Sequence, residues 1–192
     1  MDTRLELLET MMVKTERLMA EVPPASGQRP TPCGDYTVDQ LVDHVVTWVQ
    51  VFDRAVNDRP LDFDPAEHTP GPDRLGVFGD ARSSILEGLR SRGFERQMTM
   101  TGSPLPGEFV LNMLLMEYIG HGWDLAVAGD AELPFTDEEA EVALTAARAI
   151  IEPRYRGTGM FEAEVVVADD ASAIDRFIGF LGRDPNWAPA AG

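Results

Sequence analysis

The chain has 192 residues, of which 44% are hydrophobic, so it is long enough to bury one sizeable core. Its formal net charge is −17, and such an acidic surface repels phosphate backbones, which disfavours nucleic-acid binding. Cys33 is the only cysteine, which excludes an intrachain disulfide and a cysteine-rich zinc cluster, so any metal must be held by histidines and carboxylates.

The first half of the chain predicts two amphipathic helices. Over residues 2–22 apolar side chains recur at three-and-four spacing until two prolines end the run. A loop rich in proline and glycine follows, and a second helix is predicted over residues 38–57. Its start is marked by a capping box, in which Thr37 is the N-cap and Gln40 stands three residues later.

The middle of the chain combines a long loop with three further helices. Residues 58–73 contain four prolines and many acidic side chains, which predicts a solvated loop that could act as a lid. Helices are predicted over residues 75–91 and 108–128. A second capping box, formed by Thr136 and Glu139, opens a fifth helix.

The C-terminal segment has a different character. Residues 164–168 predict a short strand and residues 171–181 a last helix, which together make a strand-helix extension over residues 160–192. Because one strand cannot make a sheet, the long helices must bury their apolar faces against one another. We therefore expect an all-α fold, a four-helix bundle, with residues 1–192 forming a single domain.

Polar side chains interrupt two of the predicted apolar helix faces. Glu117, His121 and Asp124 continue the apolar face of the fourth helix, and His44 lies at the edge of the face of the second helix. A buried carboxylate without a partner costs several kcal/mol, so Glu117 requires one. Two imidazoles and a carboxylate form a ligand set that suits zinc, iron, nickel or manganese and leaves positions free for a small ligand.

The spacing alone leaves other interpretations open. His44, Glu117 and His121 could instead form a hydrogen-bonded core network without a metal. Asp124 is either an oxygen acceptor for His121 or a catalytic group that handles protons, or it is simply the partner of an arginine.

Three further residues are candidates for the same site on their residue type alone. Cys33 precedes the second helix, and the separation from His44 is about 16 Å if the intervening residues are largely helical, too far for shared coordination. His68 lies in the 58–73 loop, where we expect a solvent-exposed imidazole. Arg183 could contact a substrate carboxylate or could pin the tail to the bundle.

Three segments, TPCGDYTVDQLVDHVV, MEYIGHGWDLAVAGD and IDRFIGFLGRDPNW, resemble the DinB-like superfamily. The resemblance is to its actinobacterial branch related to mycothiol-dependent maleylpyruvate isomerases, and it spans nearly the whole chain. It implies a four-helix bundle that binds a divalent metal, usually zinc, at positions that correspond to His44, Glu117 and His121. Isomerases of this family carry a further C-terminal domain that supplies a catalytic arginine, and the short tail seen here departs from that pattern.

Three functions follow as hypotheses. The first is a metal-dependent enzyme that uses mycothiol, a low-molecular-weight thiol, for S-transfer to an electrophile or for isomerisation, with Asp124 as the candidate catalytic residue. The second is a metal-water hydrolase in the same site, and the third is a non-catalytic module that binds a metal or a small ligand and could form a homodimer. No run of about eighteen apolar residues occurs and no signal peptide is evident, so we expect a cytoplasmic protein without membrane partners.

Overall fold

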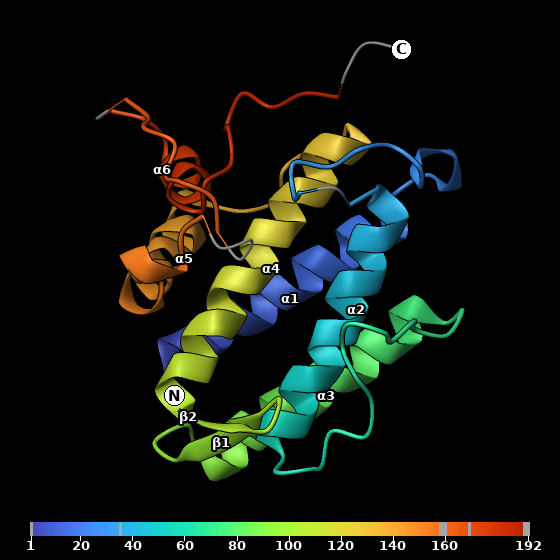
Figure 1. The fold of residues 1–192 in the computed structure, drawn as a ribbon, viewed down its shortest axis with the longest axis vertical. Helices are drawn as coiled ribbons and strands as arrows, with labels where there is room; N and C mark the ends of the chain where they lie inside the picture. Colours follow the sequence, from blue (N-terminus) through green and yellow to red (C-terminus); the bar gives the residue numbers. More distant parts are fainter. Residues whose placement is uncertain (1, 35, 158–160, 169, 190–192) are drawn as a thin grey trace.

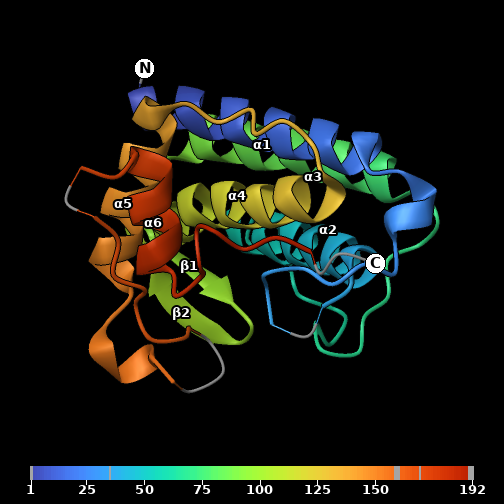
Figure 2. The same ribbon diagram turned by 90° about the horizontal axis from the view of Figure 1, so that it is seen from above.

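The computed structural model describes residues 2–34, 36–157, 161–168 and 170–189. Its helices are α1 (Thr3–Glu21), α2 (Val38–Val56), α3 (Arg74–Arg92), α4 (Gly107–Gly129), α5 (Asp137–Ile150) and α6 (Ala173–Phe180). The first four form a bundle of two layers, with α1 beside α3 and α2 beside α4, while α5 packs on the outer side of α4 and α6 packs on α5 (Figures 1 and 2). The predicted all-α bundle is confirmed.

The helix starts follow local capping chemistry. The side chain of Thr37 accepts a hydrogen bond from the backbone of Gln40, whose own side chain returns one to the Thr37 backbone, and Thr136 and Glu139 repeat this pattern at α5. Each box satisfies two backbone N–H groups that a helix start leaves without partners. Both predicted capping boxes are therefore confirmed, and the helices lie where the periodicity placed them.

A β-hairpin that the sequence did not predict connects α3 to α4. Strands β1 (Gln97–Met100) and β2 (Ser103–Pro106) are antiparallel, and Met98 lies opposite Leu105. Thr101 and Gly102 form the two-residue turn, with φ of 48° and 81°, as the tightest hairpin connections require. The prolines and glycines around this turn indicated only a break between helices, because the strands are too short to show a period.

The predicted strand at residues 164–168 is wrong. The described residues of this segment form no strand; instead, the Val165 amide donates to the carbonyl of Gly179 in α6, at 2.9 Å. Gly179 permits this approach, since a Cβ there would lie 2.6 Å from the Val165 carbonyl oxygen. The apolar run thus lies against a helix and has no strand to pair with. Residue 160, where the extension was expected to begin, lies outside the described residues.

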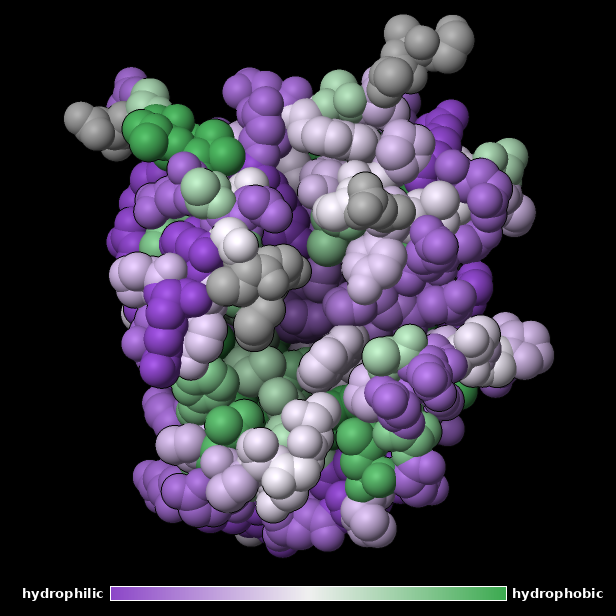
Figure 3. All heavy atoms as spheres, in the orientation of Figure 1, coloured by the Kyte–Doolittle hydropathy of each residue, from purple (hydrophilic) through white to green (hydrophobic). Residues whose placement is uncertain are grey.

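Helix α4 runs through the centre of the molecule. It contacts α1, α2 and α5, so it is buried on most of its circumference, and polar side chains on it need partners within the protein. Although α4 is apolar, no helix in the described ranges combines the length and hydropathy needed to cross a bilayer. In Figure 3, hydrophobic residues gather in a hollow beside the hairpin, on the face where α4 is least covered.

Candidate metal centre

The three side chains of the predicted triad converge between α2 and α4. Glu117 Oε1 lies 3.6 Å from His44 Nε2 and 3.3 Å from His121 Nε2. The two imidazole rings lie 4.9 Å apart between centroids and are nearly perpendicular, at 77°. One nitrogen or oxygen atom from each residue lies within 4.8 Å of those of the other two, so residues from two helices share one small volume.

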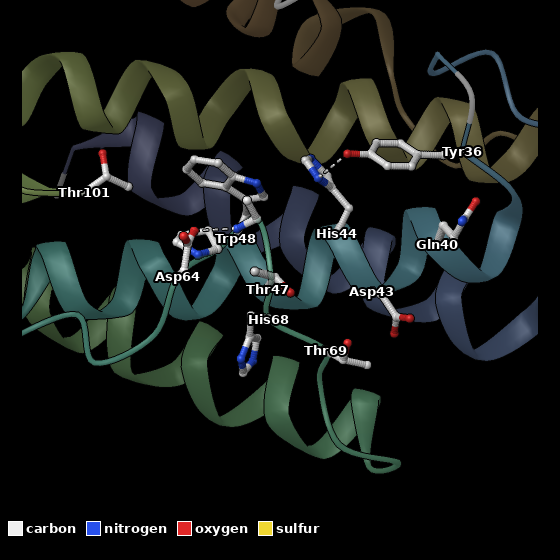
Figure 4. A pocket seen from close by; sticks show the side chains of 12 residues that line it. Tyr36, Gln40, Asp43, His44, Thr47, Trp48, Asp64, His68, Thr69 and Thr101 are labelled. Carbon is white, nitrogen blue, oxygen red and sulfur yellow. Dashed lines mark hydrogen bonds between the residues drawn. The ribbon is translucent and has the colours of Figure 1, made fainter.

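Both imidazoles are oriented through their other ring nitrogen. The Tyr36 hydroxyl shares a hydrogen bond of 3.3 Å with His44 Nδ1, and Figure 4 shows the tyrosine ring directed at this histidine. On α4, His121 Nδ1 lies 3.0 Å from Asp124 Oδ2. Both Nε2 atoms therefore face Glu117. Histidines that bind a metal show the same arrangement, in which one ring nitrogen faces the ion and the other is hydrogen-bonded to an oxygen.

Asp124 connects this group to the C-terminal tail. Arg183 Nε donates to Asp124 Oδ1 at 2.7 Å, and a terminal nitrogen of the same arginine donates to Oδ2 at 2.8 Å. Asp124 is fully buried, so the paired hydrogen bonds satisfy a carboxylate that would otherwise be costly. Asp124 is thus both a hydrogen-bond acceptor for His121 and the ion-pair partner of an arginine. The sequence analysis gave these two roles as alternatives.

Charge within the group decides the protonation of its members. Burial alone would raise the pKa of Glu117, but the charge and hydrogen bonds of the two histidines outweigh it and hold the pKa below its usual range. Burial would lower the pKa of His121, yet Glu117 and Asp124 raise it well above normal. Burial likewise opposes the ionised form of Asp124, and the Arg183 charge nevertheless keeps its pKa low. The carboxylates therefore stay ionised at neutral pH.

Cys33 lies closer to the site than the sequence suggested. Its sulfur belongs to a second group of potential ligand atoms, within 4.8 Å of one another, contributed by Cys33, His121 and Asp124. The sequence had set Cys33 only against His44, whereas its approach to the site is through His121 and Asp124 on α4, because the chain before α2 folds back on itself. The Thr31 amide donates to the Tyr36 carbonyl at 3.1 Å and closes a turn that carries Cys33 toward α4.

The third histidine lies outside the triad. His68 stacks on Phe63 with 4.2 Å between ring centroids, and its Nε2 lies 3.3 Å from the side-chain nitrogen of Gln50 on α2. These contacts leave it half-buried, so the fully exposed imidazole that we expected is wrong. Residues of the 58–73 loop pack against α2 and form one wall of a cavity beside His44 (Figure 4).

The donor set fits a divalent ion. Ligand atoms bonded to tetrahedral zinc at about 2.0–2.1 Å lie roughly 3.3 Å from one another, close to the two separations that Glu117 makes with the imidazoles. Two nitrogens and one carboxylate oxygen also match the composition of open zinc sites. The same contacts would equally join protonated histidines to a carboxylate in an ion-pair network.

Comparison with known proteins places the fold and the family. Residues 8–126 match the family described as mycothiol maleylpyruvate isomerase N-terminal domain. Two uncharacterized proteins of Mycobacterium tuberculosis, MT0763 and Rv0738, are each 27% identical over 157 residues, which cover 80% of this chain and 83% of theirs. A crystal structure of the mycothiol-dependent maleylpyruvate isomerase superposes with a TM-score of 0.54 and 17% identity, over 77% of this chain and 68% of that one. With the family matching well over half of its length, the chain belongs to the mycothiol maleylpyruvate isomerase N-terminal domain family.

Proposed function

We propose that the protein is a metal-dependent enzyme that uses mycothiol, and that His44, Glu117 and His121 hold its divalent ion, most readily zinc. The observation that carries this proposal is the convergence of two Nε2 atoms and one carboxylate oxygen beside a cavity of about 650 Å³. The family and the isomerase with the similar fold are both named for mycothiol, which supports it as the thiol. The reaction class is S-transfer to an electrophile or isomerisation through a thiol adduct.

An ion bound by three protein ligands would keep a position open, and it would lower the pKa of a coordinated thiol so that the thiolate is available at neutral pH. The chain itself contributes position and charge. Tyr36 holds the His44 ring, and Asp124 holds the His121 ring, so both nitrogens stay directed at one point. Glu117 contributes the negative charge that favours a cation there.

Asp124 acts in this proposal as a positioning residue. The sequence nominated it as a catalytic group for proton transfer, but its side chain is fully buried and both oxygens are bonded to Arg183. With its pKa held low by that arginine, the carboxylate is a poor proton acceptor. Its contribution is to orient His121 and to favour the tautomer with Nε2 unprotonated.

The proposal is tested with cobalt-substituted protein, which reports on ligands through its absorption spectrum. Mycothiol added to the cobalt-loaded chain should produce an intense sulfur-to-metal charge-transfer band and release about one proton, because the coordinating form is the thiolate. Under the same conditions the His68→Ala variant should give the same band, since His68 lies outside the triad. The His44→Ala variant should lose it.

A fully cobalt-loaded protein that shows neither band nor proton release with millimolar mycothiol would contradict thiol coordination. The control is an oxygen analogue of mycothiol in which a hydroxyl replaces the sulfhydryl. It can bind the protein through the rest of the molecule but has no sulfur to coordinate the ion. It should produce no charge-transfer band. Circular dichroism of each variant shows whether the helical fold is intact, so that loss of the band can be assigned to the site.

A further inference from the structure

A largely apolar cavity extends from the triad toward the hairpin. Its volume is about 650 Å³, within the usual range for small-molecule sites. All three residues of the triad contribute to its lining. Apolar side chains supply most of the remaining wall, among them Phe52, Met100, Leu105, Phe109, Met113 and Met116.

The imidazole and cationic side chains on the wall of this cavity already face acidic partners within the protein: His44 and His121 face Glu117, and Arg183 is bonded to Asp124. None of them is left free to pair with a carboxylate ligand. Arg183 is the only arginine or lysine among the described residues that line it, and its side chain is committed to both oxygens of Asp124. Glu117 adds an acidic side chain to the wall. The chain as a whole carries a formal charge of −17, so the surrounding field also disfavours an anionic ligand.

A second cavity, of about 740 Å³, lies against the 58–73 loop and has a different lining. Gln40, Asp43, Thr47 and Asp64 supply hydrogen-bonding groups to it (Figure 4). The two cavities share Tyr36, His44, Trp48 and Thr101, so they meet beside the triad. The polar cavity suits a hydroxyl-rich or amide-bearing molecule, and the apolar one is left for a different reactant.

We propose that the apolar cavity binds the second reactant of the thiol chemistry, and that this reactant is an uncharged, apolar electrophile. That the ligand is an electrophile rests on the proposed function. That it is uncharged rests on the lining of the cavity alone. In the reaction, the thiolate sulfur forms a bond to an electrophilic carbon. A leaving group such as chloride departs with the electron pair of its bond to that carbon, and the thiol proton goes to solvent.

The charge preference can be measured without turnover, on the full chain without added metal, so that no open coordination position attracts a carboxylate. The probes are ethyl 3-nitrobenzoate, which is uncharged, and 3-nitrobenzoate, which is its anionic counterpart. Calorimetric titration should show that the ester binds about tenfold more tightly or better, since a buried carboxylate needs a partner that the cavity lacks. Equal binding, or tighter binding of the anion, would overturn the inference.

Leu105 provides a matched pair of variants. It is half-buried on β2, lines the cavity and does not belong to the triad. Leu105→Lys adds a cation to the wall and should abolish or reverse the preference for the ester. Leu105→Met has a side chain of similar length without the charge and should keep the preference. If the two variants bind the probes alike, the ligands do not occupy this cavity and the inference is wrong.

A turnover experiment separates the cavity from the proposed function. The zinc-loaded chain, mycothiol and ethyl 4-chloro-3-nitrobenzoate should yield the thioether faster than the free acid does, after each rate is divided by the uncatalysed rate with the same thiol. Ester-selective binding without any catalysed thioether formation would contradict the proposed thiol chemistry while supporting the assignment of the cavity. Faster turnover of the acid would contradict the assignment of the cavity while supporting the thiol chemistry.

Discussion

Asp124 contacts side chains from two distant parts of the sequence, His121 one turn earlier on α4 and Arg183 in the C-terminal tail. One buried carboxylate therefore links the tail to the proposed metal centre. His44, Glu117 and His121 could be identified from the sequence because polar residues stood out on periodic apolar faces. Cys33 and Arg183 could not be placed, since both lie in irregular segments where periodicity carries no information about direction.

Replacing Asp124 should therefore affect both stability and metal affinity. Asp124→Asn leaves the buried Arg183 guanidinium without its counter-charge, and breaking such a pair costs roughly 3–5 kcal/mol in the free energy of unfolding. It also loosens His121 and should weaken zinc binding by roughly 10–100-fold. Urea unfolding and competition with a chromophoric chelator measure the two effects.

The double variant Asp124→Asn with Arg183→Met supplies the control. It removes the unpaired buried cation, so it should recover part of the stability lost in the single variant but little of the zinc affinity. A single variant as stable as the wild type, or a double variant that loses the sum of the two single effects, would contradict this account of the pair.

Tyr118 illustrates the opposite situation. Its side chain is 1% exposed, and its hydroxyl has no hydrogen-bond partner among the described residues. Tyr118→Phe should therefore be neutral or should stabilise the protein by up to about 1 kcal/mol, because a buried hydroxyl without a partner carries a desolvation cost. Phe78, which packs edge-on against Tyr118, is the contrasting position, where replacement by alanine should cost roughly 3–5 kcal/mol. A Tyr118→Phe variant that loses more than about 1 kcal/mol would reveal a bonded hydroxyl.

At the scale of elements, the order of the helices was predictable and the short strands were not. Capping boxes and three-and-four spacing are local signals, because they involve residues only a few positions apart in the sequence. The starts of α2 and α5 could therefore be predicted without knowing the fold. The conformations of the β1–β2 hairpin and of residues 164–168 depend instead on which part of the protein packs against them. An apolar run as short as residues 164–168 fits a strand or a partly covered loop equally well.

The close packing of α4 against Phe135, in the segment before α5, and against α1 gives an element-scale prediction. A Cβ at Gly122 would lie 2.5 Å from Phe135 Cζ and 3.2 Å from Thr15 Oγ1, so Gly122→Ala should destabilise the protein by roughly 1–3 kcal/mol despite the better helix propensity of alanine. On the same helix, a Cβ at Gly129 meets only Val22, at 3.8 Å. Gly129→Ala should be neutral or slightly stabilising. If both variants have the same midpoint of thermal unfolding, the close contacts at position 122 do not require glycine there and the prediction is wrong.

At the scale of the whole molecule, the core does not depend on the metal centre. The buried apolar residues of α1 to α4 form one continuous cluster, and the triad lies beside it, with His44 and Glu117 partly exposed and His121 buried. We therefore expect the metal-free protein to be folded. The triad converges only in the folded chain, so if it holds zinc as proposed, a free zinc concentration one hundred times the dissociation constant should add about 2.7 kcal/mol of stability.

For a chain of this size, that gain corresponds to a rise of roughly 5–10 °C in the midpoint of thermal unfolding. The rise should be absent in Glu117→Gln, where the metal loses its anionic ligand, and present in His68→Ala. Calorimetry with and without zinc makes the comparison. A metal-free wild type that is already unfolded would contradict the separation of core and site.

The central claim is that His44, Glu117 and His121 together hold one divalent ion, and zinc content after gel filtration tests it most directly. The wild type and His68→Ala, loaded with zinc and cleared of free metal, should each retain about one zinc per chain, because three protein ligands suffice for a stable open site. His44→Ala, Glu117→Ala and His121→Ala, treated identically and shown to be folded, should retain almost none. Zinc-free wild type, or triad variants that keep one zinc per chain, would contradict the claim.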